Sequence, residues 1–217
     1  MYQKMRSEVF VAVVLLSFLP LELGAQAVVE NYTSVTDDRL INPEEHNWLS
    51  YRGTLDGWGY SKLDQINDTN IDELQPVWSF STGVLGGHES PPIVNDGVMF
   101  ITTPGNFLYA IEAATGDLLW RYQHNLPENY IAFHRTNRGV ALYGDKVYMA
   151  TLDARVIALD ATTGEKVWDT PVQDNSFGYY ITMAPLAIDG KILVGTSGGE
   201  LGIRGFVVAL DAESGTE

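Results

Sequence analysis

The sequence contains no cysteine and few basic residues. Its 217 residues include 13 Lys and Arg against 28 Asp and Glu, for a formal net charge of −15. The absence of cysteine excludes disulfide scaffolds, thiolate zinc sites, iron–sulfur ligation, thiol nucleophiles and lipidated cysteine. The small number of basic residues argues against nucleic acid as a partner, because phosphates bind to basic surfaces. What is present, 45% apolar residues, is enough for a folded core.

The N-terminal apolar run is too short to cross a membrane. It covers residues 9–21, which carry no charge, and it follows Lys4 and Arg6. A bilayer needs about 20 such residues. The small-x-small sequence at 25–27 then supplies a cleavage site, so residues 1–27 are predicted to be a signal peptide for export to the periplasm. We expect no membrane span after cleavage; a buried N-terminal helix is the alternative, disfavoured by a proline and a glutamate near the end of the run.

A repeat of about 50 residues determines the predicted architecture. Similar sequences occur at 110–120, 158–168 and 209–215, with their glycines spaced 48 and then 51 residues apart. A period of this length with one tryptophan per unit is typical of propellers and solenoids. The chain is therefore not expected to adopt a Rossmann or barrel fold.

Each unit carries the local signals of four short strands. An alternating strand leads into an Asp/Glu-x-x-Thr/Ser-Gly turn, and a tryptophan four residues after the glycine begins the next strand. Further hairpins with tight turns are expected at 94–99, 142–148 and 187–192. We therefore predict an all-β fold, a β-propeller whose tryptophans pack between neighbouring sheets.

The number of units is too small for a closed propeller. Propellers close with four to eight blades, whereas this chain holds about three copies, and the third stops before position 219, where its tryptophan is expected. We therefore expect residues 28–217 to be the N-terminal part of a longer propeller domain.

Five segments resemble the exported quinoprotein alcohol dehydrogenases, the methanol and ethanol dehydrogenase family that uses pyrroloquinoline quinone (PQQ) and a bound metal ion. They are residues 47–51, 58–67, 74–83, 137–145 and 195–202. The resemblance covers nearly the whole mature sequence. It implies an eight-bladed propeller of four-stranded sheets joined by tryptophan-docking motifs.

The resemblance also implies a set of site residues. The predicted cofactor-binding residues are Glu89, Arg138, Thr182, Ser197, Gly198 and Gly199, and the predicted metal ligand is Glu200. The chemistry is suitable, because guanidinium and hydroxyl groups can bind the quinone carboxylates and Glu200 can bind calcium or a lanthanide. The alternatives are a solvated loop acid at Glu89, an arginine joining two blades at Arg138, and a surface glutamate at Glu200.

The implied reaction is alcohol oxidation by hydride transfer to the quinone, with electrons passed to a periplasmic cytochrome c. The family's catalytic aspartate and an asparagine metal ligand would lie beyond Glu217, so no turnover is expected from these 217 residues alone. The resemblance also allows a homodimer. A quinoprotein that oxidises sugars or polymeric alcohols remains an alternative.

One departure from the family pattern concerns a cysteine pair that many members carry over the quinone. The corresponding positions here are Ala132 and Phe133. Our hypothesis is that Phe133 or His134 covers the cofactor instead, because an aromatic ring can stack on a planar quinone. The four histidines show no zinc-ligand spacing.

A non-catalytic periplasmic propeller acting as an assembly or scaffold protein is the alternative from another functional class. The outer-membrane assembly lipoproteins have similar repeats. They need a lipidated cysteine, which this chain lacks. They also give no reason for Arg138, Ser197 and Glu200 to occur together in matching contexts.

Overall fold

Three antiparallel sheets form the framework of the described residues. A computed structural model describes residues 29–217, so the predicted signal peptide lies outside the described residues. The first sheet, in the order β1-β2-β3-β4, contains β1 Ile93–Asn95, β2 Val98–Thr103, β3 Phe107–Glu112 and β4 Leu118–Gln123. The second, in the order β5-β6-β7-β8, contains β5 Val140–Tyr143, β6 Lys146–Ala150, β7 Arg155–Asp160 and β8 Lys166–Pro171. The third contains β9 Leu186–Ile188, β10 Lys191–Gly195 and β11 Val207–Asp211.

These sheets confirm the predicted all-β blades. Each strand pairs antiparallel with the next strand along the chain, and the third sheet has three strands among the described residues. The first two sheets share one irregularity, a register shift after Ala110 in β3 and after Ala158 in β7. Because the two shifts are 48 residues apart, they follow the sequence repeat.

Tight turns close the first hairpin of each sheet, as the sequence predicted. In the first sheet Asp96 and Gly97 both have positive φ, and Asp189 and Gly190 do the same in the third. Two successive positive φ values are characteristic of a type I′ turn, whose twist matches that of the flanking strands. We call the first strands of the three sheets, β1, β5 and β9, the innermost strands. They run in the same direction: the residues just before them lie together, with Gly139 beside Ser90 and Ala184, and the turns that follow them all contact residues 33–37.

Tryptophan docking joins neighbouring sheets, again as predicted. The ring of Trp120, in β4, is fully buried against Gly164 of the second sheet, and its indole N–H donates to the Ala161 carbonyl at 3.1 Å. A Cβ at Gly164 would lie 2.6 Å from that ring, so only glycine fits there. The same contact is made by Trp78 on the first sheet and by Trp168 on the third.

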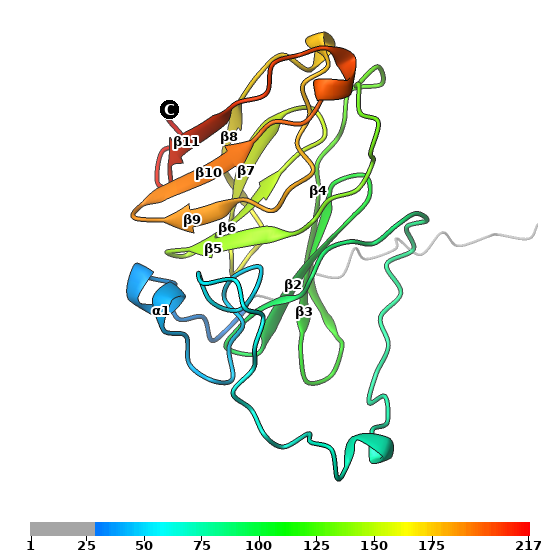
Figure 1. Cartoon of the computed structure of the whole chain (residues 1–217), viewed down its shortest axis with the longest axis vertical. Helices are drawn as coiled ribbons and strands as arrows, with labels where there is room; N and C mark the ends of the chain where they lie inside the picture. The colour runs from blue at the N-terminus through cyan, green and yellow to red at the C-terminus, as the bar shows by residue number, and fades with distance from the viewer. Residues whose placement is uncertain (1–28) are drawn as a thin grey trace, which may run out of the picture.

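Four short helices lie outside the sheets in residues 29–217. They are α1 Asp37–Ile41, η1 Ile71–Glu73, η2 Asn175–Phe177 and η3 Gly199–Leu201. Figure 1 shows α1 beside the ends of β5 and β9, and the segment with η1 extending away from the sheets. In the part of the chain that the structure describes, no helix is long and apolar enough to cross a membrane.

The N-terminal segment that contains α1 contacts all three sheets at their first hairpin turns. This clasp segment, residues 29–50, pairs Val35 with Gly144 of the second sheet and receives a hydrogen bond from Asp189 N of the third on Asp37. In the first sheet, the carboxylate of Asp96 accepts from the backbone N–H of Thr33 at 2.8 Å. The clasp segment therefore fixes one end of all three innermost strands.

Candidate functional site

The predicted site residues gather at the opposite end of the innermost strands. Glu89 precedes β1, Arg138 precedes β5 and Thr182 precedes β9. We call this the open end, and the end with the hairpin turns and the clasp segment the turn end. Because the three strands run in the same direction, residues just before them meet at one end although they are more than 40 positions apart in sequence.

Arg138 connects the first of these segments to the third. Its Nη2 lies 2.9 Å from Oε2 of Glu89, and its Nη1 donates to the Thr182 hydroxyl at 2.6 Å. The Arg138 and Glu89 side chains are 37% and 46% exposed, so solvent reaches the pair. A guanidinium has more N–H donors than these two contacts use, and the others have no partner within residues 29–217. The predicted residues Glu89, Arg138 and Thr182 are thus brought together, and the Arg138 guanidinium keeps further N–H groups that could bind a ligand.

Residues 180–182 form backbone hydrogen bonds both to Arg138 and to the Gly-rich segment that begins at Ser197. The Arg138 N–H donates to the Thr182 carbonyl at 2.9 Å, and the Ser197 N–H donates to the Tyr180 carbonyl at 2.7 Å. Thr182 is buried, and Ser197 is half-buried. This short segment therefore brings the fourth predicted residue, Ser197, to the open end.

The two predicted glycines differ in their surroundings. A Cβ at Gly198 would lie 2.1 Å from the carbonyl oxygen of Gly178, and Gly198 has φ +118. The contact with its own chain already requires glycine there. At Gly199 nothing lies within 4 Å of the Cβ position, so that face of the backbone is open.

Glu200 follows these glycines and is bound by Tyr180. The Tyr180 hydroxyl donates a short hydrogen bond to Oε1 of Glu200, which is exposed. That hydrogen bond lowers the pKa of Glu200, and the nearby His134 lowers it further. Burial and the Glu200 carboxylate raise the pKa of Tyr180 to about 12, so the hydroxyl keeps its proton at neutral pH. The arrangement keeps Glu200 ionised and able to bind a cation.

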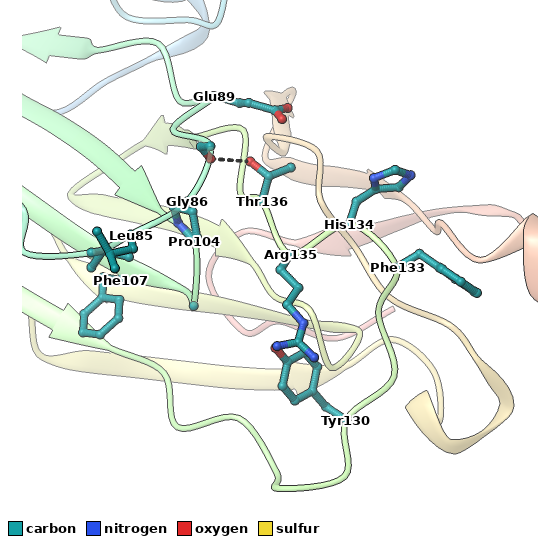
Figure 2. Close-up of a pocket in the computed structure, with 13 residues that line it drawn as sticks. Leu85, Gly86, Glu89, Pro104, Phe107, Tyr130, Phe133, His134, Arg135 and Thr136 are labelled. Carbon is teal, nitrogen blue, oxygen red and sulfur yellow. Dashed lines mark hydrogen bonds between the residues drawn. The ribbon is translucent and has the colours of Figure 1, made fainter.

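A cleft of about 560 Å³ lies beside this cluster. Of the predicted cofactor-binding residues, only Glu89 lines it. Phe133 and His134, one of which is expected to cover the cofactor in place of the cysteine pair, line it as well. Figure 2 shows these side chains together with Arg135, whose guanidinium lies 5.5 Å from the centre of the Tyr130 ring. The cleft lining does not include Arg138, Thr182, Ser197 or Glu200, so the predicted set occupies the cleft and the surface next to it.

Sequence reasoning missed two residues that position the site. Tyr180 is buried like a core residue, and no local sequence pattern indicates its bond to Glu200. Asn137 is also buried; its amide donates to the Ala150 carbonyl at 2.9 Å and its Oδ1 accepts from the Thr102 hydroxyl at 2.8 Å. Its place beside Arg138 in the Asn-Arg-Gly sequence was the available signal.

The side chains that could bind a metal ion are not clustered in residues 29–217. Within residues 29–217, no three His, Asp or Glu side chains lie close enough to hold a metal ion together. The buried pair of His124 and Asp153, 2.9 Å apart, joins the first two sheets. Glu200 therefore has no second or third carboxylate or imidazole beside it that would complete a metal site within residues 29–217.

Comparison with protein families gives a direct match. The family described as glucose/ethanol/alcohol dehydrogenase, β-propeller domain, with PQQ, matches residues 48–217. The chain is 38% identical to quinoprotein alcohol dehydrogenase PedH of Pseudomonas putida over 97% of its own length and 35% of that protein's. It is 40% identical to the quinoprotein ethanol dehydrogenase of Pseudomonas putida, over 95% and 34% of the two lengths. The chain thus spans about a third of the length of the curated relatives it matches.

Solved structures of related enzymes share the fold. The quinohemoprotein alcohol dehydrogenase ADHIIG of Pseudomonas putida HK5 superposes with a TM-score of 0.80 at 39% identity, over 85% of this chain and 28% of that one. A europium-containing methanol dehydrogenase superposes with a TM-score of 0.78 at 37% identity, over 82% and 32% of the two chains. Both likenesses extend the match from sequence to the arrangement of the sheets.

Proposed function

The chain belongs to the PQQ-dependent quinoprotein alcohol dehydrogenase family, and from that premise we propose that it forms part of the cofactor face of a periplasmic enzyme that oxidises an alcohol. The observation that supports this most directly is the contact of Arg138 with both Glu89 and Thr182 at the open end. When bound, the quinone supplies a reducible carbonyl that accepts hydride from the alcohol carbon.

The donor set fits a ligand with several carboxylates. Arg138 has N–H groups beyond those that bind Glu89 and Thr182, and a guanidinium can bind a carboxylate through two parallel hydrogen bonds. Thr182 and Ser197 lie on two segments that are joined by the backbone hydrogen bonds between Tyr180 and Ser197. Their hydroxyls can donate further hydrogen bonds. In this proposal these three residues orient the cofactor, while Glu89 limits how far the guanidinium can move. The exposed backbone face of Gly199 leaves room for the ligand.

Glu200 is proposed as the carboxylate that this chain contributes to a metal site. The hydrogen bond from Tyr180 keeps it deprotonated. Calcium takes about six to eight oxygen ligands, so one carboxylate supplies a minority of them and the others come from elsewhere. A lanthanide, with similar preference for oxygen, would use the same group. We assign no general base to the described residues.

The partner proposals follow from charge and family membership. The substrate is a small alcohol, and the electron acceptor is a periplasmic cytochrome c. The net charge of −15 favours an acceptor with a basic contact patch, because opposite potentials speed encounter.

Quinone binding tests the proposal. The 217-residue chain is titrated with PQQ in the presence of calcium, and binding is followed by quenching of tryptophan fluorescence. We expect saturable binding that weakens at least about tenfold in Arg138→Ala, because a charge-assisted hydrogen-bonding group is lost. The matched control is Arg155→Ala, which breaks an ion pair with Asp169 in the second sheet. Binding that is absent, or that is equal in both variants, would overturn the proposal and favour a non-catalytic propeller.

A further inference from the structure

His134 lines the cleft that borders the proposed site. Its side chain lines the cleft with Glu89, and it lies close enough to Glu200 to lower the pKa of that carboxyl electrostatically. In Figure 2, His134 lies at the same end of the cleft as Glu89, whereas the Phe133 ring points away from it. His134 therefore belongs to the same polar cluster as the residues proposed to hold the cofactor and the metal.

The backbone around His134 lies near the same cluster. The backbone of His134 and Phe133 is close enough to the Tyr180 hydroxyl to oppose the rise in its pKa. The same hydroxyl donates to Glu200. Tyr180 therefore binds the predicted metal ligand and lies close to the loop of His134.

The imidazole is available to a ligand. His134 is exposed, and neither ring nitrogen has a hydrogen-bond partner within residues 29–217. Phe133 is also exposed, at 63%, but its ring carries no donor and is directed away from Glu89. An imidazole N–H among carboxylates complements a ligand that itself carries carboxylate and carbonyl oxygens.

We propose that His134 is a further cofactor-contacting residue, whose imidazole N–H donates a hydrogen bond to an oxygen of the bound quinone from the side of the cleft. The inference rests on the proposed function and goes beyond it, since it selects His134 over Phe133 and assigns it a donor role rather than a stacking one. Arg138 and His134 would then approach the quinone from two neighbouring segments of the same loop.

The binding test uses three substitutions of His134, the substitution Phe133→Ala and one control. In the quinone titration of the 217-residue chain, His134→Ala is expected to weaken binding roughly tenfold, as the loss of one hydrogen bond to a charged oxygen predicts. His134→Gln keeps an N–H donor and should restore most of the affinity, whereas His134→Phe keeps a planar ring and should not. His46→Ala, at an exposed histidine of the clasp segment, should match the unsubstituted chain.

The outcomes separate the two proposals. If Arg138→Ala loses affinity but His134→Ala stays within twofold of the unsubstituted chain, the role of His134 is wrong and the proposed function stands. If His134→Phe restores binding as well as His134→Gln, or if Phe133→Ala has the larger effect, the donor role is wrong. If the unsubstituted chain does not bind the quinone, the proposed function fails and the role of His134 fails with it.

A second measurement tests the geometry without any ligand. Glu200→Gln removes the charge that faces His134 and should shift the NMR signals of the His134 ring, while the ring signals of His46 stay in place. Unchanged His134 signals would place the imidazole away from Glu200 and would overturn the inference independently of quinone binding.

Discussion

The two ends of the innermost strands each contain an arginine paired with a glutamate, in different surroundings. At the turn end Arg39 binds Glu44 at 2.8 Å and also donates to the Thr33 carbonyl and to Asn95 Oδ1. At the open end Arg138 binds Glu89 at 2.9 Å. The Arg39 side chain is 13% exposed, whereas that of Arg138 is 37% exposed.

This difference separates structural from functional use of the same residue type. Arg39 is surrounded by acceptors of its own chain, so its binding capacity is largely used in joining the clasp segment to the first sheet. Arg138 retains donors that are open to solvent, next to the cleft. Residues that stabilise the fold and residues proposed to bind a ligand therefore lie at opposite ends of the same strands, and each set can be altered separately.

The largest expected effect is on the turn end, through tryptophan docking. Trp120→Ala removes a fully buried ring and its hydrogen bond to Ala161, and should lower the free energy of unfolding by about 3–5 kcal/mol. Urea unfolding of the 217-residue chain measures the change. Leu118→Ala, at an exposed position of the same strand, is the control and should change stability by less than about 0.5 kcal/mol. Similar losses in both variants would show that docking does not hold the sheets together.

The two arginines give a direct test of the comparison. Arg39→Ala should lower the free energy of unfolding by about 2–3 kcal/mol, because it leaves several partly buried acceptors without a donor. Arg138→Ala should cost less than about 1 kcal/mol, because its ion pair is open to solvent. Quinone affinity should respond in the reverse order. If Arg138→Ala destabilises the chain as much as Arg39→Ala does, the two ends do not differ in the way described.

The smallest expected effect concerns acid stability at the turn end. Hydrogen bonds from Arg39 and Asn47 lower the pKa of Glu44 to about 2 from an ordinary value of 4.5. Because the folded pKa is the lower one, this stabilisation is complete above pH 4.5 and is lost as the pH falls towards 2. The Glu44 side chain is 43% exposed, so the loss should be below about 1 kcal/mol. Urea unfolding at a series of pH values should show a shallower acid slope in Glu44→Gln; an equal slope would contradict the assignment.

The sequence predicted the features that repeat and missed those that depend on distant contacts. The turns at Gly116 and Gly164, the hairpins and the docking of Trp120 follow from local patterns that recur along the chain, and the structure confirms them. The clasp segment was not predicted, because its bond between Asp37 and Asp189 joins residues 152 positions apart. A usable signal for α1 was present, since Thr36 precedes two aspartates as a helix cap does.

The candidate site was predicted as a set of residues but not as a geometry. Arg138 and Glu89 were named through family resemblance, and their contact needed the structure because they lie in different segments. The bond between Tyr180 and Glu200 could not be predicted, since a buried tyrosine gives no local indication of where its hydroxyl points. The roles of the site residues in binding the quinone and a metal remain predictions.

Tryptophan docking gives the row of sheets a direction. Each contact joins unlike surfaces, with an indole from one unit inserted against the glycine turn of the following unit, as Trp120 and Gly164 illustrate. A head-to-tail contact of this kind reproduces itself at every junction. A gene duplication that added one unit would therefore create a junction of a kind already present in the chain. This provides a physical route by which such proteins can grow blade by blade without inventing a new interface.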